Sequence, residues 1–168
     1  MDVLFVLYQH HERLLSLLVQ LEKTPWENTA QIQTLFHQLA AAFLSQSRGE
    51  RELLYSRLMT FREARRLVRE SLQELLRLEH CVEEIKQLKT SDDRWYWLYE
   101  EFKDGLREHI HEQEDGIFKK IRKLFREPER GEMGLALSQY QASCLTSLAQ
   151  PAEKQADAAP QFKLPPAA

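Results

Sequence analysis

Apolar residues recur every three or four positions along most of the chain, which is the spacing of one face of an α-helix. A few polar residues stand in these stripes where the period calls for an apolar side chain. The three clearest stripes are Leu4, Leu7, His11, Leu14, Leu18 and Leu21; Ile32, Phe36, Leu39, Phe43, Gln46, Glu50 and Leu53; and Trp95, Tyr99, Phe102, Leu106, His109, Gln113, Ile117 and Ile121. The pattern therefore predicts helices whose buried faces carry polar groups.

Breaks in the pattern separate these helices. We expect helices over 2–22, from 28 or 29 to about 58 with a kink at Gly49, over 62–88 and over 93–125, because Pro25, Asp92 and Pro128 mark the boundaries. A fifth amphipathic segment covers 133–148. The prediction is an all-α protein, an antiparallel up-down four-helix bundle with a short fifth C-terminal helix. It forms one domain over 1–150 with its core in 2–126, and the Ala/Pro-rich residues 151–168 form a disordered tail.

The polar residues of the stripes indicate a site. An unpaired buried polar group costs about 1–3 kcal/mol, so several of them on inward faces suggest that they meet, most simply around a metal ion. Gln46 with Glu50, and His109 with Gln113, are spaced four apart and so share a helix face. His80 stands at the edge of its stripe beside Glu84 and fits either the core or the solvent. In a metal-free alternative, Glu50 pairs with a histidine and the glutamines complete a hydrogen-bonded network.

Four short segments, residues 8–14, 46–55, 79–80 and 109–118, resemble in order the motifs of the hemerythrin-type, HHE cation-binding family, over residues 2–126. That family has a histidine on the first helix of each repeat and a His-x-x-x-Glu on the second. The resemblance implies a four-helix bundle with a di-iron centre. Carried over by position, it implies four metal ligands: His11, Glu50, His80 and His109.

The chain departs from the family pattern at two ligand positions. Gln46 stands where the family has histidine, and Gln113 stands where it has glutamate. Glu114 matches the longer spacing of some relatives, so it and the two glutamines are reserve ligands. Three imidazoles and one carboxylate can hold a single Fe²⁺ or Zn²⁺, whereas two irons lack a second bridging carboxylate. A mononuclear site, a di-iron site and a metal-free core all stay open.

The resemblance implies a protein that binds or senses iron, O₂ or NO, with a metal ion and a small diatomic ligand as partners. The alternative is a degenerate, metal-free member that acts as an interaction module, as a homodimer or with a protein partner, through the apolar side of helix 133–148. An enzyme is not expected, since the chain has no Gly-x-Ser-x-Gly or His-Glu-x-x-His motif. The Glu-x-x-His motif of di-iron oxidases is missing at His80 and His109, because Arg77 and Leu106 stand three residues before them.

Composition narrows the classes of partner. The 168 residues carry a net charge of −3, which gives no general attraction to nucleic acid or an anionic membrane. Arg62, Arg65, Arg66 and Arg69 alternate with glutamates and indicate a solvated helix face. The two cysteines form no disulfide framework. With no signal segment and no apolar run of about 20 residues, a cytoplasmic protein is expected.

Overall fold

The computed structural model describes residues 1–148, and those residues form helices and short connections without any strand. The predicted tail, 151–168, lies outside the described residues. The helices are α1 (Val3–Lys23), α2 (Thr29–Gly49), α3 (Ser56–Leu58), α4 (Arg65–Lys86), α5 (Asp93–Glu112), α6 (Phe118–Leu124) and α7 (Glu127–Leu148). Two π-helical segments, η1 (Glu50–Tyr55) and η2 (Gln113–Ile117), continue α2 into α3 and α5 into α6. The predicted all-α class is confirmed.

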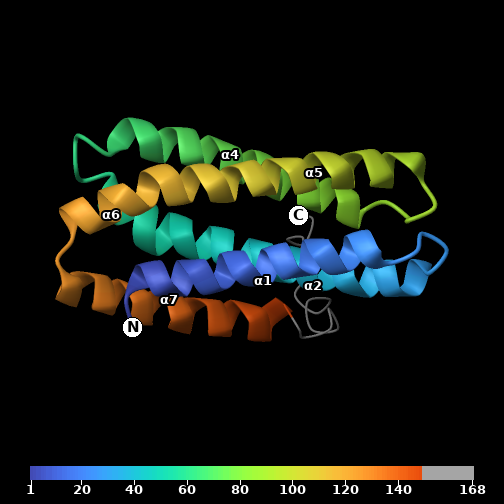
Figure 1. Ribbon diagram of the computed structural model, residues 1–168, viewed down its shortest axis with the longest axis horizontal. Helices are drawn as coiled ribbons and strands as arrows, with labels where there is room; N and C mark the ends of the chain where they lie inside the picture. Colours follow the sequence, from blue (N-terminus) through green and yellow to red (C-terminus); the bar gives the residue numbers. More distant parts are fainter. Residues whose placement is uncertain (149–168) are drawn as a thin grey trace, which may run out of the picture.

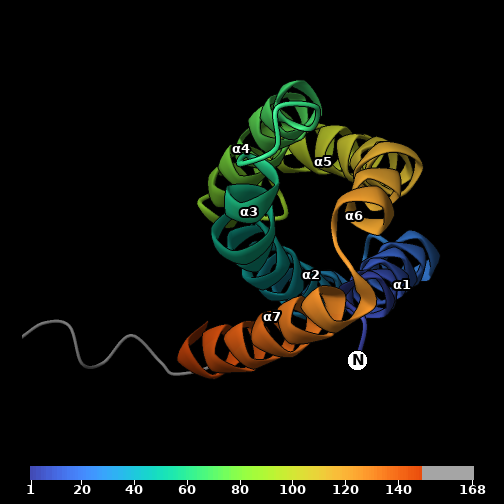
Figure 2. The same cartoon turned by 90° about the vertical axis from the view of Figure 1, so that its left-hand side faces the viewer.

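The long helices lie side by side as a bundle, and consecutive ones are joined at alternate ends (Figure 1). Viewed along their length, α1, α2, α4 and α5 surround a common interior, and α7 lies outside against α1 and α2 (Figure 2). Phe43 of α2 meets Phe102 of α5 edge to face across this interior, with ring centroids 5.2 Å apart. Leu18, Leu39 and Leu78 are fully buried beside them. The predicted inner stripes therefore form the core.

Short polar side chains start three of the helices. Asp2 accepts a hydrogen bond from the backbone N–H of Leu4, Asn28 from that of Gln31, and Asp92 from that of Arg94. These side chains satisfy backbone donors that have no partner within the helix. Near the start of α5, the side chain of Trp97 is 70% exposed, whereas the neighbouring Trp95 is buried.

Helix α7 is longer than expected. It begins at Glu127 and spans 22 residues, against 21 for α1. Pro128 suggested a break, but proline is tolerated in the first turn of a helix, where its missing N–H would have no partner. The helix is held against the start of α1, where Arg130 pairs with Asp2 at 2.7 Å and a Cβ on Gly134 would clash with the carbonyl oxygen of Met1.

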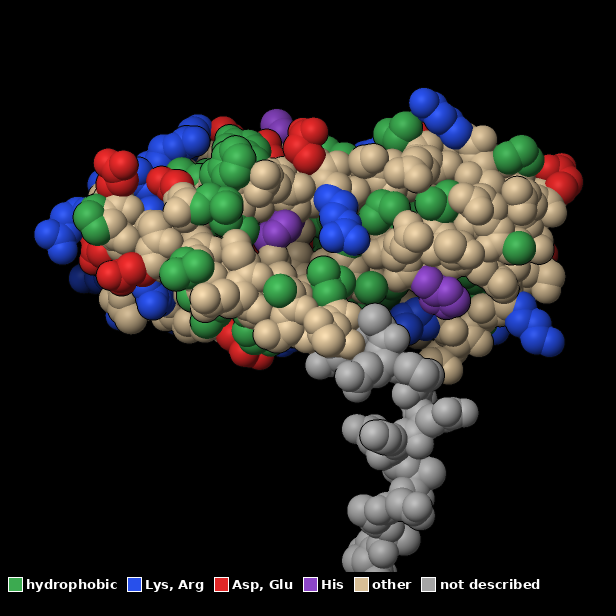
Figure 3. Space-filling model, turned by 90° about the horizontal axis from the view of Figure 1, so that it is seen from below, with side chains coloured by type: hydrophobic (Ala, Val, Ile, Leu, Met, Phe, Trp, Pro, Cys, Tyr) green, Lys and Arg blue, Asp and Glu red, His purple; other side chains and the backbone are tan. Residues whose placement is uncertain are grey.

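The apolar side of α7 faces its own bundle. Met133 and Leu137 are 2% and 1% exposed, so the stripe that suggested a partner surface is already buried. Hydrophobic side chains on the outer face seen from below lie in separate groups (Figure 3). Because this stripe is buried, it does not support the expected homodimer or partner contact through 133–148. Within residues 1–148, no helix combines the length and apolar character needed to cross a membrane.

Candidate functional site

Both π-helical segments begin at a polar residue of the core. Glu50 opens η1 and Gln113 opens η2, and both side chains are buried. A π-helical turn contains more residues than an α-helical turn, so neighbouring side chains are rotated less from one another, and such turns are frequent at functional sites. As a result, Gln113 and Glu114 both reach His11 on α1, although an α-helix would separate them by about 100°.

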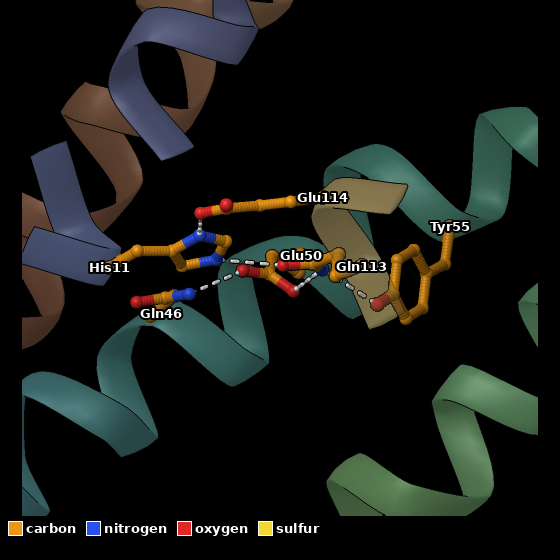
Figure 4. Close-up of polar contacts among 6 residues, drawn as sticks. All are labelled: His11, Gln46, Glu50, Tyr55, Gln113 and Glu114. Carbon is orange, nitrogen blue, oxygen red and sulfur yellow. Dashed lines mark hydrogen bonds and ion pairs between the residues drawn. The ribbon is translucent and has the colours of Figure 1, made fainter. Parts of the chain in front are cut away.

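A continuous chain of hydrogen bonds joins the buried side chains (Figure 4). Glu50 is fully buried and accepts one amide N–H at each carboxylate oxygen, from Gln46 at 2.7 Å and from Gln113 at 2.6 Å. The carbonyl oxygen of Gln113 lies 2.8 Å from Nε2 of His11. The amide of Gln113 thus stands directly between the imidazole and the carboxylate.

The partners of His11 determine its protonation. Its Nδ1 lies 2.7 Å from a carboxylate oxygen of Glu114, and its Nε2 faces the carbonyl oxygen of Gln113. Both partners are acceptors, because the amide nitrogen of Gln113 is directed at Glu50. Both ring nitrogens therefore face acceptors, an arrangement that a doubly protonated imidazole would satisfy at both positions. Phe118 stacks on this ring at a centroid distance of 5.7 Å.

The network continues from Gln113 toward α4. The amide nitrogen of Gln113 also donates to the Tyr55 hydroxyl at 2.9 Å, and this hydroxyl lies 2.7 Å from Oγ of Ser71. Sequence reasoning did not include Tyr55 or Ser71 among the site residues. Tyr55 had a signal, as the aromatic residue that closes the second family-like segment. Ser71 had none, since it lies on α4 away from every motif.

Burial dominates the electrostatics of the carboxylate. Removal from water raises the pKa of Glu50, and the positive charge of His11 and the amide donors of Gln113 and Gln46 oppose that rise only in part. The pKa of the Tyr55 hydroxyl is raised well above its usual value, first by burial and then by the negative charge of Glu50. The phenol therefore remains a neutral member of the network.

His109 is buried near His11 but is not part of the network. Its side chain is 2% exposed, and its Nε2 has no hydrogen-bond partner among the described residues. Burial lowers its pKa to about 4, with help from the positive charge of His11 and against the attraction of Glu74. At neutral pH this imidazole is uncharged.

His80 does not reach the core. Its side chain is 77% exposed and lies 3.3 Å from Glu84 on the surface of α4. Of the two placements that its position at the stripe edge left open, the structure has the solvent-facing one. Of the four residues that the resemblance implied as ligands, His11 and Glu50 belong to one network, His109 lies beside it, and His80 is remote. The reserve residues Gln46, Gln113 and Glu114 all join the network.

Few side chains in and around the network can act as metal ligands. Across residues 1–148, no group of three or more His, Cys, Asp or Glu side chains is arranged closely enough to hold a metal ion. Two of the groups nearest to Glu50 are amides, which donate hydrogen bonds to it. The cluster can hold protons and fix three helices to one another.

Comparison with known proteins identifies the family. The sequence model of the hemerythrin HHE cation-binding domain matches residues 2–121, from the first residue before α1 to the middle of α6. No curated protein and no solved structure matches the chain. The match covers more than half of the chain and contains all the members of the network, although α7 lies beyond it. The chain therefore belongs to the hemerythrin HHE cation-binding domain family.

Proposed function

We propose that this chain is a family member in which a charged hydrogen-bonded network takes the place of the metal centre, and that it acts as an interaction module rather than as a carrier or sensor of iron, O₂ or NO. The observation that carries the proposal is that both oxygens of Glu50 and both nitrogens of His11 already have partners within the protein. Each oxygen of Glu50 accepts an amide N–H, and both nitrogens of His11 face acceptors.

The residues present do not fit the di-iron centre that the family implies. A metal ion needs a lone pair on an imidazole nitrogen, but both nitrogens of His11 carry a proton in this arrangement. It also needs carboxylates that bridge or neutralise it, and a neutral amide stands at Gln113 in place of one of them. His80, which the resemblance implied as a ligand, lies in solvent.

The network supplies its own counter-charge. A buried carboxylate requires a nearby cation or a proton, because an isolated charge in the interior costs several kcal/mol. The imidazolium of His11 provides a positive charge next to Gln113, and Glu114, which is one-third exposed, balances it from the other side. A proton on His11 therefore does the electrostatic work that a metal ion would do in this position.

A single metal ion is the second candidate, and one observation favours it. His109 presents a buried, uncharged imidazole whose Nε2 has no hydrogen-bond partner in the described part of the chain. Such an atom is able to coordinate a metal. Metal binding here would require the side chain of Gln113 to turn away and His11 to lose a proton. The metal-free network requires neither change, so we propose it first.

Metal content separates the two candidates. Two preparations are compared: protein purified aerobically, and protein given Fe²⁺ without oxygen and then exposed to air. Both are expected to hold less than about 0.1 iron per chain and to show no iron–oxo charge-transfer band. The matched variant restores the family residues through Gln46→His with Gln113→Glu, and it is expected to take up iron because it adds an imidazole and a carboxylate. Iron bound by the unmodified chain would contradict the proposal. If neither protein binds iron, the bundle geometry rather than the two glutamines excludes the metal.

The surface that supports an interaction role lies at the end of the bundle where α4 meets α5. A cleft of about 620 Å³ opens there, which falls within the range of ligand-binding pockets. Its walls are formed by Glu84, Gln87, Leu88, Arg94, Trp97 and Leu98. Trp97 stands 70% exposed at this cleft, and exposed tryptophans are over-represented among the residues that dominate binding energy.

Charge indicates the kind of partner. The segment 79–104, which contains every residue that lines the cleft, has eight acidic and four basic residues, a net charge of −4. Apolar side chains in the cleft wall, carried on a segment with excess negative charge, favour a protein segment that offers an apolar side chain flanked by lysine or arginine. We propose a basic amphipathic segment of another protein as the occupant.

Binding of model peptides tests this surface. A synthetic amphipathic peptide of leucine and lysine is expected to bind at least about tenfold more tightly than a matched peptide of leucine and glutamate, and Trp97→Ala should remove that preference. Phe5→Ala is the control, since Phe5 is also an exposed aromatic residue but lies on α1 near the opposite end (Figure 1). Equal affinity for both peptides, or an equal effect of both variants, would exclude the cleft as the docking site.

A further inference from the structure

A small polar cavity lies between α1, α2 and α7, next to the network but separate from it. Its volume is about 40 Å³, and the residues that define its chemistry are His10, Arg13, Ser45, Gln46, Gln141 and Leu145. Gln46 borders this cavity and also donates to Glu50, so one side chain connects the cavity to the core. Gln141 contributes from α7, which lies beyond the part of the chain that the family model matches.

Two carbonyl oxygens at this cavity have no hydrogen-bond donor. Gln46 and Gln141 are 5% and 6% exposed, and the Oε1 atom of each is buried and without a partner within residues 1–148. Their amide nitrogens are engaged elsewhere, that of Gln46 with Glu50 and that of Gln141 with Nδ1 of His10 at 2.9 Å. An unsatisfied buried acceptor costs about 1–3 kcal/mol, so two at one cavity indicate a missing donor.

We propose that this cavity binds water, as a small neutral hydrogen-bond donor that bridges the amide oxygens of Gln46 and Gln141. A water needs about 10–15 Å³ of volume measured in this way and two to four polar partners. The cavity has room for about three such molecules, and Ser45 and His10 add further polar atoms to its wall. The bridge would link α7 to the Glu50 carboxylate through a single side chain.

The surroundings select a neutral ligand over a cation. Two amide oxygens alone would also suit ammonium or a metal ion, but the guanidinium of Arg13 lines the same cavity. His10 adds no negative charge, and its Nδ1 is already engaged by the amide nitrogen of Gln141. Across the cavity, α7 contributes the uncharged side chains of Gln141 and Leu145.

Water contacts to the two side chains test the site in the full-length protein. Cross-relaxation in NMR spectra is expected between water and the side-chain amide protons of Gln46 and Gln141. Gln141→Leu should abolish the contact at Gln46 and shift its amide resonances. Gln139→Leu is the control, because Gln139 is an exposed glutamine on the same helix. Contacts at Gln46 that survive Gln141→Leu, or that are missing from the unmodified protein, would overturn the proposal.

A crystal structure of the unmodified chain at about 1.5 Å provides a second measurement that does not depend on a variant folding. We expect electron density for water within hydrogen-bond distance of both Oε1 atoms. An empty cavity, or an amide turned so that a protein donor fills the position, would overturn the inference. Neither result bears on iron content or on the Trp97 cleft, so this inference and the proposed function fail separately.

Discussion

At the scale of single residues, Gln113 changes the chemistry of the core. Its carbonyl oxygen accepts from His11, and its amide nitrogen donates to Glu50 and Tyr55. A glutamate at this position offers only acceptors when ionised, and it would add a second charge beside Glu50. The amide instead fits between a donor and an acceptor. Gln113, where the family pattern has glutamate, therefore matches a hydrogen-bond donor on one side and an acceptor on the other.

Replacing Glu50 tests whether its shape or its charge holds the network. Glu50→Gln is expected to lower the free energy of unfolding by about 1–2 kcal/mol, because the partnerless Oε1 of Gln46 can turn toward the new amide. Glu50→Leu leaves the amide nitrogens of Gln46 and Gln113 without their acceptor and should cost about 3 kcal/mol or more. Denaturant unfolding at pH 7 measures both. A loss for Glu50→Gln as large as that for Glu50→Leu would mean that the negative charge itself is required.

The neutral, buried state of His109 predicts a pH dependence. Its folded-state pKa of about 4 lies below the unfolded value of 6.5, so between these pH values the unfolded chain binds more protons than the folded one. The contribution of His109 to stability is present above pH 6.5 and is lost as the pH falls to 4, by up to about 3 kcal/mol.

The raised pKa of Glu50 acts in the opposite sense, because the folded protein then loses stability as the pH rises through it. Comparing the unmodified protein with the His109→Gln variant isolates the contribution of His109 to the pH dependence, because both proteins contain Glu50 and His10. With chelator present, the difference in unfolding free energy between the two proteins should change steadily from pH 6.5 to 4. A constant difference would show that His109 is not held in the neutral form.

At the scale of helical elements, the π-helical turns explain why the sequence predicted only part of the site. The three-and-four spacing correctly placed His11, Glu50, His109 and Gln113 on inward faces, because that spacing describes a regular α-helix. It gave Glu114 only as a reserve ligand, and a regular α-helix would place Glu114 about 100° around the axis from Gln113. The turn at η2 brings Glu114 to His11, and local sequence gives no signal for such a turn.

Helix α7 makes a prediction from its closest approach to the bundle. A Cβ on Gly134 would clash with the carbonyl oxygen of Met1 and would stand 2.9 Å from the nitrogen of Val3, and both are backbone atoms that cannot move aside freely. Gly134→Ala is therefore expected to lower the free energy of unfolding by about 2 kcal/mol or more and to increase hydrogen exchange in α7.

Gly131 offers the matched control on the same helix. A Cβ there meets no atom within 4 Å, so Gly131→Ala should raise stability by up to about 1 kcal/mol through helix propensity. If Gly134→Ala were as stable as Gly131→Ala, α7 would not lie against the chain start as described here.

At the scale of the whole molecule, the sequence predicted the fold class better than the use of its surfaces. Periodicity is sufficient to assign helices and their buried sides, because burial of an apolar face is what orders them. Which neighbour a side chain meets depends on the packing between helices. The sequence alone therefore could not tell that Met133 and Leu137 cover α1 and α2, that Trp97 stands in solvent, or that His80 faces outward.

The central claim is that a proton on His11, held between Gln113 and Glu114, takes the place of a metal ion. The most direct test is the imidazole nitrogen NMR spectrum of the metal-free protein at neutral pH, before and after one equivalent of Zn²⁺. Both nitrogens of His11 are expected to carry protons, and their resonances are expected to stay unchanged when zinc is added. A His11 nitrogen that lacks a proton, or that shifts and loses its proton when zinc is added, would contradict the central claim.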